Sequence, residues 1–288
     1  MEKKSKLDLI LGIGLIAITA QALNLFTVFR LKNLLDTQQI ALPRIPLAVI
    51  LVFFLSTVIF MGIILFLVPN SILKIIMRVI FAFAYLWGMM IALSVSFPVS
   101  IAIPVSLVIC FLWLIKPRVF LQNLLLIFAL VSAGALFGPL FAPWKILLFL
   151  LAISIYDIVA VRSGYMIWMA KQLSDFHTLP AFIIPQRVDM WNLSLKEADL
   201  NKLMDGKAVE KELSLLGGGD IGLPLILVAS VFFTYGFVSS LIVAAFSLGG
   251  LVFAYWLHLY LFKGKPLPAL PPISVVALIG YLVVRLMG

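Results

Sequence analysis

The chain has 288 residues, of which 64% are hydrophobic and only 11% are charged. Soluble globular proteins are roughly 45–50% apolar and about 25% charged, so this composition excludes a soluble protein and predicts an integral membrane protein. The formal net charge of +9 comes from basic residues in short segments between apolar runs, as membrane topology requires, so we predict contact with a lipid bilayer and no nucleic-acid partner.

Continuous apolar runs of about 20 residues, long enough to cross roughly 30 Å of hydrocarbon, recur along the chain. Helices are the expected spanning element because lipid offers no partner for an unpaired backbone group, and the alternating segments typical of a β-barrel are absent. The predicted fold class is an all-α integral membrane protein with nine transmembrane helices. In chain order the predicted spans lie at about residues 9–28, 46–68, 75–95, 98–115, 119–137, 145–161, two within 221–261, and 272–287.

The first span has an alternative interpretation. A lysine-rich start precedes its apolar run, and Ala20-Gln21-Ala22 imitates a cleavage site, so the segment is similar to a secretory signal peptide. The run is nevertheless about 20 residues long, enough to span a bilayer. We therefore expect a retained first helix, followed by a polar linker over residues 30–44.

The long polar stretch 162–216 divides the chain into parts. Residues 1–161 are predicted to form an N-terminal bundle of six helices, and residues 217–288 a C-terminal part of three helices. The C-terminal part contains an apolar stretch, 221–261, that is too long for one span and too short for three. Gly236 and Ser239-Ser240 lie near its middle, which predicts two spans with a break there.

Residues 162–216 are predicted to be a cytoplasmic connecting loop, partly an interfacial helix and partly mobile. The apolar and aromatic run Tyr165–Met169, with basic residues on both sides, suits a helix at the membrane surface. Ser194–Glu197 fits a capping box ahead of spaced leucines, which predicts a short amphipathic helix. A mobile, solvated connector over residues 175–213 is the alternative.

Nine spans place the two termini on opposite sides of the membrane. Most of the 21 Lys and Arg residues fall in the segments on the N-terminal side, which include the long loop. The positive-inside bias therefore predicts a multi-pass protein of the cell membrane, with its N-terminus and residues 162–216 in the cytoplasm and its C-terminus outside.

Two aspartates, Asp157 and Asp220, lie in or beside apolar segments that can span a bilayer. A charged group there costs about 2.5 to 3.5 kcal/mol on insertion scales and marks a functional site by default. Asp157 lies late in the sixth span and Asp220 opens the seventh, so the two carboxyl groups come to similar depths near the cytoplasmic side. The alternative is structural: each aspartate caps a helix or pairs with a basic residue such as Arg162.

Two carboxyl groups at one depth can form an acid–base dyad. They cannot both ionise readily when they share a site, so one is held protonated. The ionised group can then take a proton from water while the other protonates the carbonyl under attack. Intramembrane carboxylates also carry protons and ions, so an ion or proton channel or transporter is the alternative function.

The sequence gives little support for a metal ion or cofactor. Its one cysteine, Cys110, excludes an internal disulfide framework and any cysteine-based metal cluster. The two histidines, His177 and His258, are far apart and make a weak zinc case. We therefore predict no metal and no cofactor, and we interpret the mid-span His258 as a packed histidine in preference to a proton relay.

Two stretches near the aspartates predict unusual backbone. The triplet Gly217-Gly218-Gly219 lets the backbone approach another chain closely and adopt a positive φ, although flexible lead-ins to helices also use such triplets. The stretch Pro266–Pro272 has four prolines in seven residues and cannot be regular helix. Its unpaired carbonyls can receive an extended peptide.

Three short segments, Ile155–Asp157, Gly217–Asp220 and Pro268–Leu270, resemble the Tyr-Asp, Gly-x-Gly-Asp and Pro-Ala-Leu motifs of one family, the presenilin and signal peptide peptidase family of intramembrane aspartyl proteases. Each motif alone is weak. All three in this order, on the sixth span, the seventh span and just before the ninth, are specific. The short loops and compact size are similar to those of prokaryotic, archaeal homologues of presenilin.

The resemblance implies a presenilin-like fold and an intramembrane aspartic endopeptidase that hydrolyses peptide bonds within transmembrane helices of membrane proteins. Asp157 and Asp220 would be its catalytic pair. The residues that would bind the substrate or shape its cleft are Tyr156, Gly217, Gly219, Pro268, Ala269 and Leu270. Eukaryotic presenilins have a longer loop between spans six and seven and act within a complex; because this loop is short, we expect activity without accessory subunits and leave a homo-oligomer open.

Overall fold

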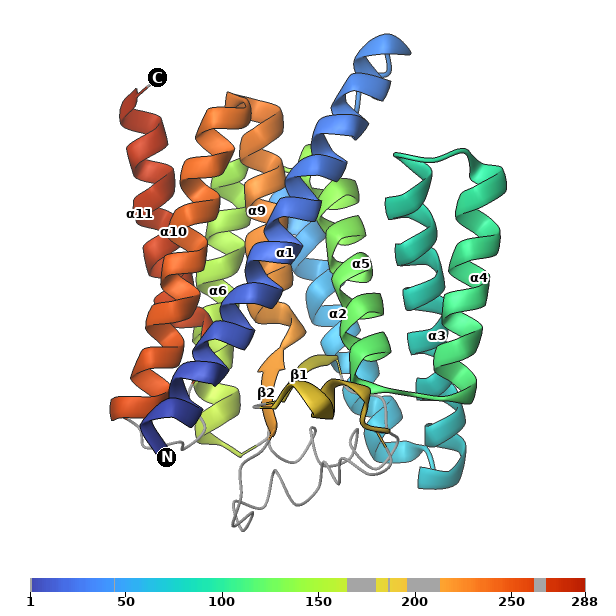
Figure 1. Cartoon of the computed structure of the whole chain (residues 1–288). Helices are drawn as coiled ribbons and strands as arrows, with labels where there is room; N and C mark the ends of the chain where they lie inside the picture. Colours follow the sequence, from blue (N-terminus) through green and yellow to red (C-terminus); the bar gives the residue numbers. More distant parts are fainter. Residues whose placement is uncertain are drawn as a thin grey trace.

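The computed structural model describes residues 2–43, 45–164, 180–185, 187–195, 213–261 and 268–287. Within these residues the α-helices lie side by side in one bundle, with a small sheet at one end (Figure 1). The helices are α1 Glu2–Thr37, α2 Leu47–Leu67, α3 Asn70–Ser94, α4 Val99–Ile115, α5 Val119–Phe137, α6 Pro143–Arg162, α9 Gly218–Tyr235, α10 Phe237–Trp256 and α11 Leu270–Met287. The shorter elements are the 3-10 helices Gly138–Leu140 and Val188–Asn192, the π-helical turn Leu257–Leu261, and the strands β1 Ala181–Pro185 and β2 Leu213–Gly217.

The predicted fold class is confirmed. Eight of the described helices are long and apolar enough to cross a membrane, and α4, with 17 residues, is the shorter ninth. The predicted break in 221–261 lies at Gly236, whose φ of 88° separates α9 from α10. Glycine adopts this left-handed conformation without the steric cost that a Cβ atom would add.

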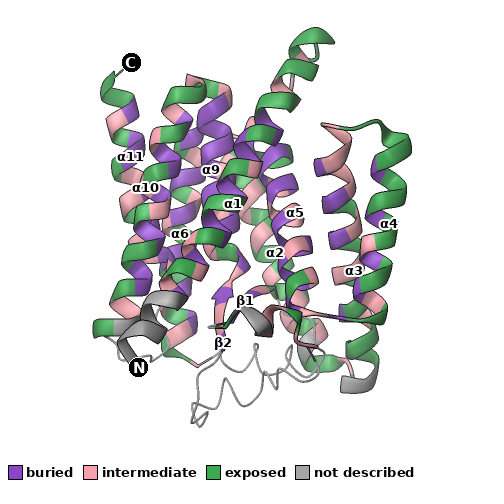
Figure 2. Ribbon diagram, viewed as in Figure 1, coloured by how far each residue is buried: buried purple, intermediate pink, exposed green. Residues whose placement is uncertain are grey.

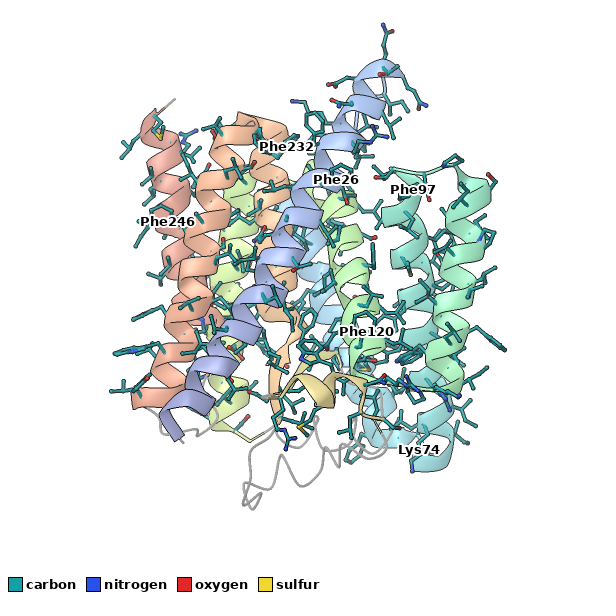
Figure 3. All side chains as sticks on the ribbon, viewed as in Figure 1. Phe26, Lys74, Phe97, Phe120, Phe232 and Phe246 are labelled. Carbon is teal, nitrogen blue, oxygen red and sulfur yellow. The ribbon has the colours of Figure 1, made fainter. Side chains whose placement is uncertain are left out.

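The two ends of the bundle differ. The start of α1 and the strands β1 and β2 lie at one end, and the end of α11 lies at the other (Figure 1). Helix α3 also runs from one end of the bundle to the other. In Figure 3, Lys74 lies near the end with the sheet, and Phe97, just beyond the helix, lies at the opposite end. Because α9 starts directly after β2, its first turn lies beside the sheet.

Helix α1 is longer than expected. The predicted polar linker over residues 30–44 is wrong for its first part, since α1 continues to Thr37. The segment holds good helix formers such as Leu31, Lys32 and Leu34, and the Lys32 ammonium lies over the Phe232 ring at 5.7 Å from its centroid. The end of α1 therefore extends past the neighbouring helices (Figures 1 and 3).

The core of the bundle is centred on α5 and α9, whose apolar windows are 56% and 61% buried (Figure 2). Close approach explains this. A Cβ atom on Gly138, at the end of α5, would clash with the Ala229 side chain and lie 3.0 Å from the Ala229 carbonyl carbon of α9. Small residues let transmembrane helices pack closely, where lipid supplies no hydrophobic drive for association.

Parts of the connecting loop 162–216 differ from the prediction. In place of a mobile connector, residues 181–185 and 213–217 form strands β1 and β2, which pair antiparallel. The β-branched and aromatic run at Phe182–Ile184 favours a strand, and these three side chains are buried. Both predicted helices, at Tyr165–Met169 and after Ser194–Leu195, lie in parts of the chain outside the described residues.

Candidate active site

Asp157 lies on the last part of α6 and is buried, with 6% of its surface exposed. Its Oδ2 atom accepts a hydrogen bond from the backbone N–H of Leu270 at 3.3 Å, and the backbone N–H of Ala269 also interacts with this carboxyl group. The sixth span and the Pro-Ala-Leu segment, which are far apart in sequence, therefore meet at Asp157.

The sequence explains why this contact forms. Helix α11 begins at Leu270, and the next two residues are prolines, which lack an N–H and suit the first turn of a helix. Of the backbone donors that a helix start leaves unpaired, those of Ala269 and Leu270 point to Asp157. The prediction that Pro266–Pro272 contains no regular helix is wrong for Leu270–Pro272, because proline fits the first turn.

Asp220 is the third residue of α9 and is half-buried. Its carboxyl group accepts a hydrogen bond from the backbone N–H of Gly217, the residue that caps the helix. An acidic side chain at this position reaches back to the cap in the manner of a capping box and is stabilised by the helix dipole. Both aspartates therefore cap helices, as the structural alternative expected, and this capping also fixes where each carboxyl group lies.

The two carboxyl groups lie close enough to interact electrostatically. Helix α6 packs against both α9 and α11, so it joins Asp157 to the capped starts of two neighbouring helices. A pair of interacting carboxyl groups, one near backbone donors of α11 and the other at the start of α9, can divide the roles of acid and base.

Among the predicted substrate-binding residues, Tyr156 takes a different direction from Asp157. It is 38% exposed, and its ring packs edge-on against Phe54 of α2, with centroids 6.1 Å apart. Ala269 and Leu270 contact the carboxyl group of Asp157, and Pro268 directly precedes them. The structure therefore gathers Ala269, Leu270 and Gly217 around the aspartates and turns Tyr156 toward α2.

The glycine triplet is used differently from the prediction. None of its members has a positive φ, so that expectation is wrong. Gly218 and Gly219 are already helical. Gly218, which sequence analysis missed, is the tightest position: its N–H donates to the Pro180 carbonyl at 2.8 Å, and a Cβ atom there would lie 2.8 Å from the same oxygen. A Cβ atom on Gly217 would lie 3.0 Å from Oδ2 of Asp220. Gly219 has open space around its Cα.

A serine pair beside the aspartate was also missed. The Oγ atoms of Ser154 on α6 and Ser274 on α11 are 2.8 Å apart and buried. Ser154 lies one turn before Asp157, and Ser274 one turn after Leu270, so two polar contacts fix α6 against the start of α11. A serine within an apolar span, one turn before an aspartate, is the sequence signal that could have pointed to Ser154.

His258 packs against the Tyr255 ring, with centroids 5.6 Å apart. The Tyr255 hydroxyl lies 2.5 Å from the Ser214 hydroxyl of β2. Within the part of the chain that the structure describes, no three His, Cys, Asp or Glu residues come together as a metal site. His177 lies outside that part.

Known proteins resemble this chain over nearly its whole length. Residues 13–288 match the profile of the family described as "Signal-peptide peptidase, presenilin aspartyl protease". No curated protein sequence matches the chain. Two solved structures of a presenilin family intramembrane aspartate protease, in space groups C222 and P2, share the fold. The first has a TM-score of 0.63 and 18% identity and covers 97% of this chain and 99% of its own. The second has a TM-score of 0.63 and 19% identity and covers 96% and 98%.

The family profile covers Asp157, Asp220 and the Pro-Ala-Leu segment. At this sequence identity the solved structures support the fold, and the family assignment rests on the profile. The chain therefore belongs to the signal-peptide peptidase and presenilin family and is a multi-pass intramembrane aspartyl protease.

Proposed function

We propose that Asp157 and Asp220 form a general acid–base dyad that hydrolyses a peptide bond within a transmembrane helix of a membrane-protein substrate. The observation that carries this proposal is the placement of the two carboxyl groups at the starts of α9 and α11, within electrostatic range of each other. The channel or transporter alternative is not favoured, because the family profile is that of proteases.

The reaction needs one water molecule and no cofactor. The ionised carboxyl group takes a proton from water as the water oxygen attacks the carbonyl carbon of the substrate. At the same time the protonated carboxyl group donates its proton to the carbonyl oxygen. In the resulting tetrahedral diol, the carboxyl group that took the proton from water donates it to the nitrogen as the carbon–nitrogen bond breaks, and the other carboxylate takes a proton from one of the two hydroxyls, whose oxygen becomes the new carbonyl oxygen. The products are a carboxylic acid and an amine, and the dyad returns to one proton.

The substrate must be extended at the bond that is cleaved, because a helix buries its carbonyls in i→i−4 hydrogen bonds. Strand β2 ends at Gly217, three residues before Asp220, and its edge facing away from β1 offers backbone groups to an added strand. The open space at Gly219 would admit substrate backbone beside the dyad.

The orientation and partners follow from the charge distribution and the loop length. We place the N-terminus and residues 162–216 in the cytoplasm and the C-terminus outside, from the positive-inside bias. This orientation favours substrate spans whose N-terminus lies outside. The short loop between α6 and α9 supports activity without accessory subunits, and cleavage by the purified chain alone in liposomes tests this. Cleavage only of substrate spans in the opposite orientation would contradict the proposed orientation.

The decisive experiment compares Asp157→Asn and Asp220→Asn with the wild-type chain in liposomes that contain a transmembrane peptide. Asparagine keeps an oxygen acceptor for the Leu270 or Gly217 N–H, so the helix caps remain, but it cannot exchange a proton. We expect each variant to lose at least about 10²-fold in cleavage rate, the scale of general acid–base catalysis. Cleavage at the wild-type rate by either variant would contradict the dyad.

A further inference from the structure

Asn123, near the start of α5, makes an unusual pair of hydrogen bonds. Its side chain is buried, with 2% exposed. Its Nδ2 atom donates to the Ile183 carbonyl at 2.7 Å, and its Oδ1 atom accepts from the Ile183 N–H at 3.0 Å. Both backbone groups of one residue in β1 are thus bound by one side-chain amide.

The register of the sheet shows which edge Asn123 occupies. In an antiparallel pair, every second residue exchanges both of its backbone hydrogen bonds with the partner strand. Gly218 N–H donates to the Pro180 carbonyl, so the bonded pairs next along the sheet are Phe182 with Leu216 and Ile184 with Ser214. Ile183 lies between them, and its N–H and C=O point to the edge away from β2.

Asn123 therefore takes the place of a third strand at the outer edge of β1. The amide is the side chain that presents a donor and an acceptor together, as a backbone residue does. It closes the β1 edge at its centre, and it attaches the sheet to α5. The edge of β2 that faces away from β1 is the other edge of the sheet, and β2 ends at Gly217, three residues before Asp220.

We propose that Asn123 is a positioning residue that sets where the β1–β2 sheet lies against α5, and so where an extended substrate on the β2 edge lies relative to Asp220. This inference rests on the proposed function. A two-stranded sheet is marginal by itself, and a slip of one residue turns every side chain to the other face. A fixed point at Ile183 prevents such a slip, because Asn123 can bind only a residue whose N–H and C=O face α5.

The neighbouring residue provides a matched control. Gln122 is also a buried amide on α5, but its Oε1 accepts from Trp113 Nε1 at 2.9 Å and its Nε2 donates to the Tyr85 hydroxyl at 2.6 Å. It links α5 to α3 and α4. Loss of the Gln122 amide removes its bonds to Trp113 and Tyr85, whereas loss of the Asn123 amide removes both bonds to Ile183 of β1.

The test uses the full chain with Asn123→Leu and Gln122→Leu, which replace an amide by an apolar side chain of similar size. Hydrogen–deuterium exchange by mass spectrometry reports on 180–185 and 213–217, and mass spectrometry of the products of a transmembrane peptide reports which bonds are cut. For Asn123→Leu we expect about tenfold faster exchange in both strands, on the scale of lost buried hydrogen bonds, and cleavage spread to neighbouring bonds. For Gln122→Leu we expect faster exchange in α3 and α4 and an unchanged set of products.

Unchanged strand exchange in Asn123→Leu overturns the proposal, as does an equal change of cleavage position in Gln122→Leu. If Asn123→Leu does not fold, Asn123→Ser is measured in the same way, since one small hydroxyl cannot reproduce both bonds and the same strand-specific change is expected. The exchange measurement needs no substrate. A wild-type chain that cleaves no peptide would therefore contradict the proposed protease function, while the exchange measurement would still decide the role of Asn123 in the sheet.

Discussion

Helices α9 and α2 are both apolar and similar in length, yet 61% of the residues in the apolar window of α9 are buried, whereas the window of α2, Leu47–Ile64, contains only exposed and partly exposed residues (Figure 2). The difference lies in their polar contacts. The Leu225 carbonyl of α9 accepts from the Asn24 side chain of α1, and Ser230 of α9 donates to the Phe141 carbonyl. In α2, Ser56 and Thr57 donate to the Phe53 carbonyl of their own helix.

The comparison teaches how this protein divides its membrane region. Lipid is as apolar as leucine, so helices associate in it through small residues and polar contacts between helices. The helices that carry the two aspartates or are capped by them, α6, α9 and α11, make polar contacts with other segments of the bundle. Helix α2 presents mostly large apolar side chains to lipid and meets α6 through Phe54, which packs on Phe149 and Tyr156.

The largest expected effect comes from adding a methyl group in the packed region. Gly138→Ala would push α9 away from α5, because the new Cβ atom would clash with Ala229. Overpacking of this kind costs about 1–3 kcal/mol. We expect a lower thermal unfolding temperature in detergent, with loss of cleavage.

The matched control is Gly62→Ala on α2, where a Cβ atom would meet nothing within 4 Å. In a helix, alanine is better than glycine by about 0.8–1 kcal/mol, so this variant should unfold at the same or a higher temperature. Equal destabilisation by the two substitutions would contradict the contrast between α9 and α2.

A smaller effect is expected at the serine pair between α6 and α11. Ser154→Ala and Ser274→Ala should each lower stability, and the double variant should show a coupling of about 0.6 kcal/mol, the average for hydrogen bonds between transmembrane helices. Because the pair lies one turn from Asp157, the cleavage rate should fall several-fold. Ser106→Ala is the control, since Ser106 donates to Ala102 within its own helix α4 and its loss should leave the rate unchanged.

Much of this architecture follows from the sequence because a membrane allows few solutions. Apolar runs must be helices, charges within them are rare and costly, and the order of spans brings Asp157 and Asp220 to one end of the bundle. The break at Gly236 was predictable because glycine punctuates an overlong apolar run.

What the sequence did not show depends on contacts between distant segments. Strands β1 and β2 are short and far apart in the chain, and their pairing is stabilised by Asn123 of α5, a residue that hydropathy assigns simply to a span. The tight fit at Gly218 arises from the Pro180 carbonyl, whose position no local pattern gives. The helical start at Leu270 likewise depends on Asp157, which supplies the cap.

The smallest expected effect concerns the contact between α2 and α6. Phe54→Ala removes edge-to-face packing on Phe149 and Tyr156, at centroid distances of 5.4 and 6.1 Å, and such pairs contribute about 0.5–1.5 kcal/mol beyond the area they bury. Phe53→Ala is the control because Phe53 is 67% exposed, and surface substitutions stay within about 0.5 kcal/mol. Both are measured by thermal unfolding and by hydrogen exchange of α2.

The cleavage rate is the measurement that best distinguishes α2 from the packed helices that hold the aspartates. Successive side chains of a helix point about 100° apart, as 3.6 residues per turn require, so the Tyr156 ring that meets Phe54 faces away from the direction of Asp157. We therefore expect Phe54→Ala to raise exchange in α2 and to lower the cleavage rate less than Ser154→Ala does. A larger loss of rate in Phe54→Ala would show that α2 takes part in holding the aspartates, and the contrast between the packed helices and α2 would then be wrong at the site itself.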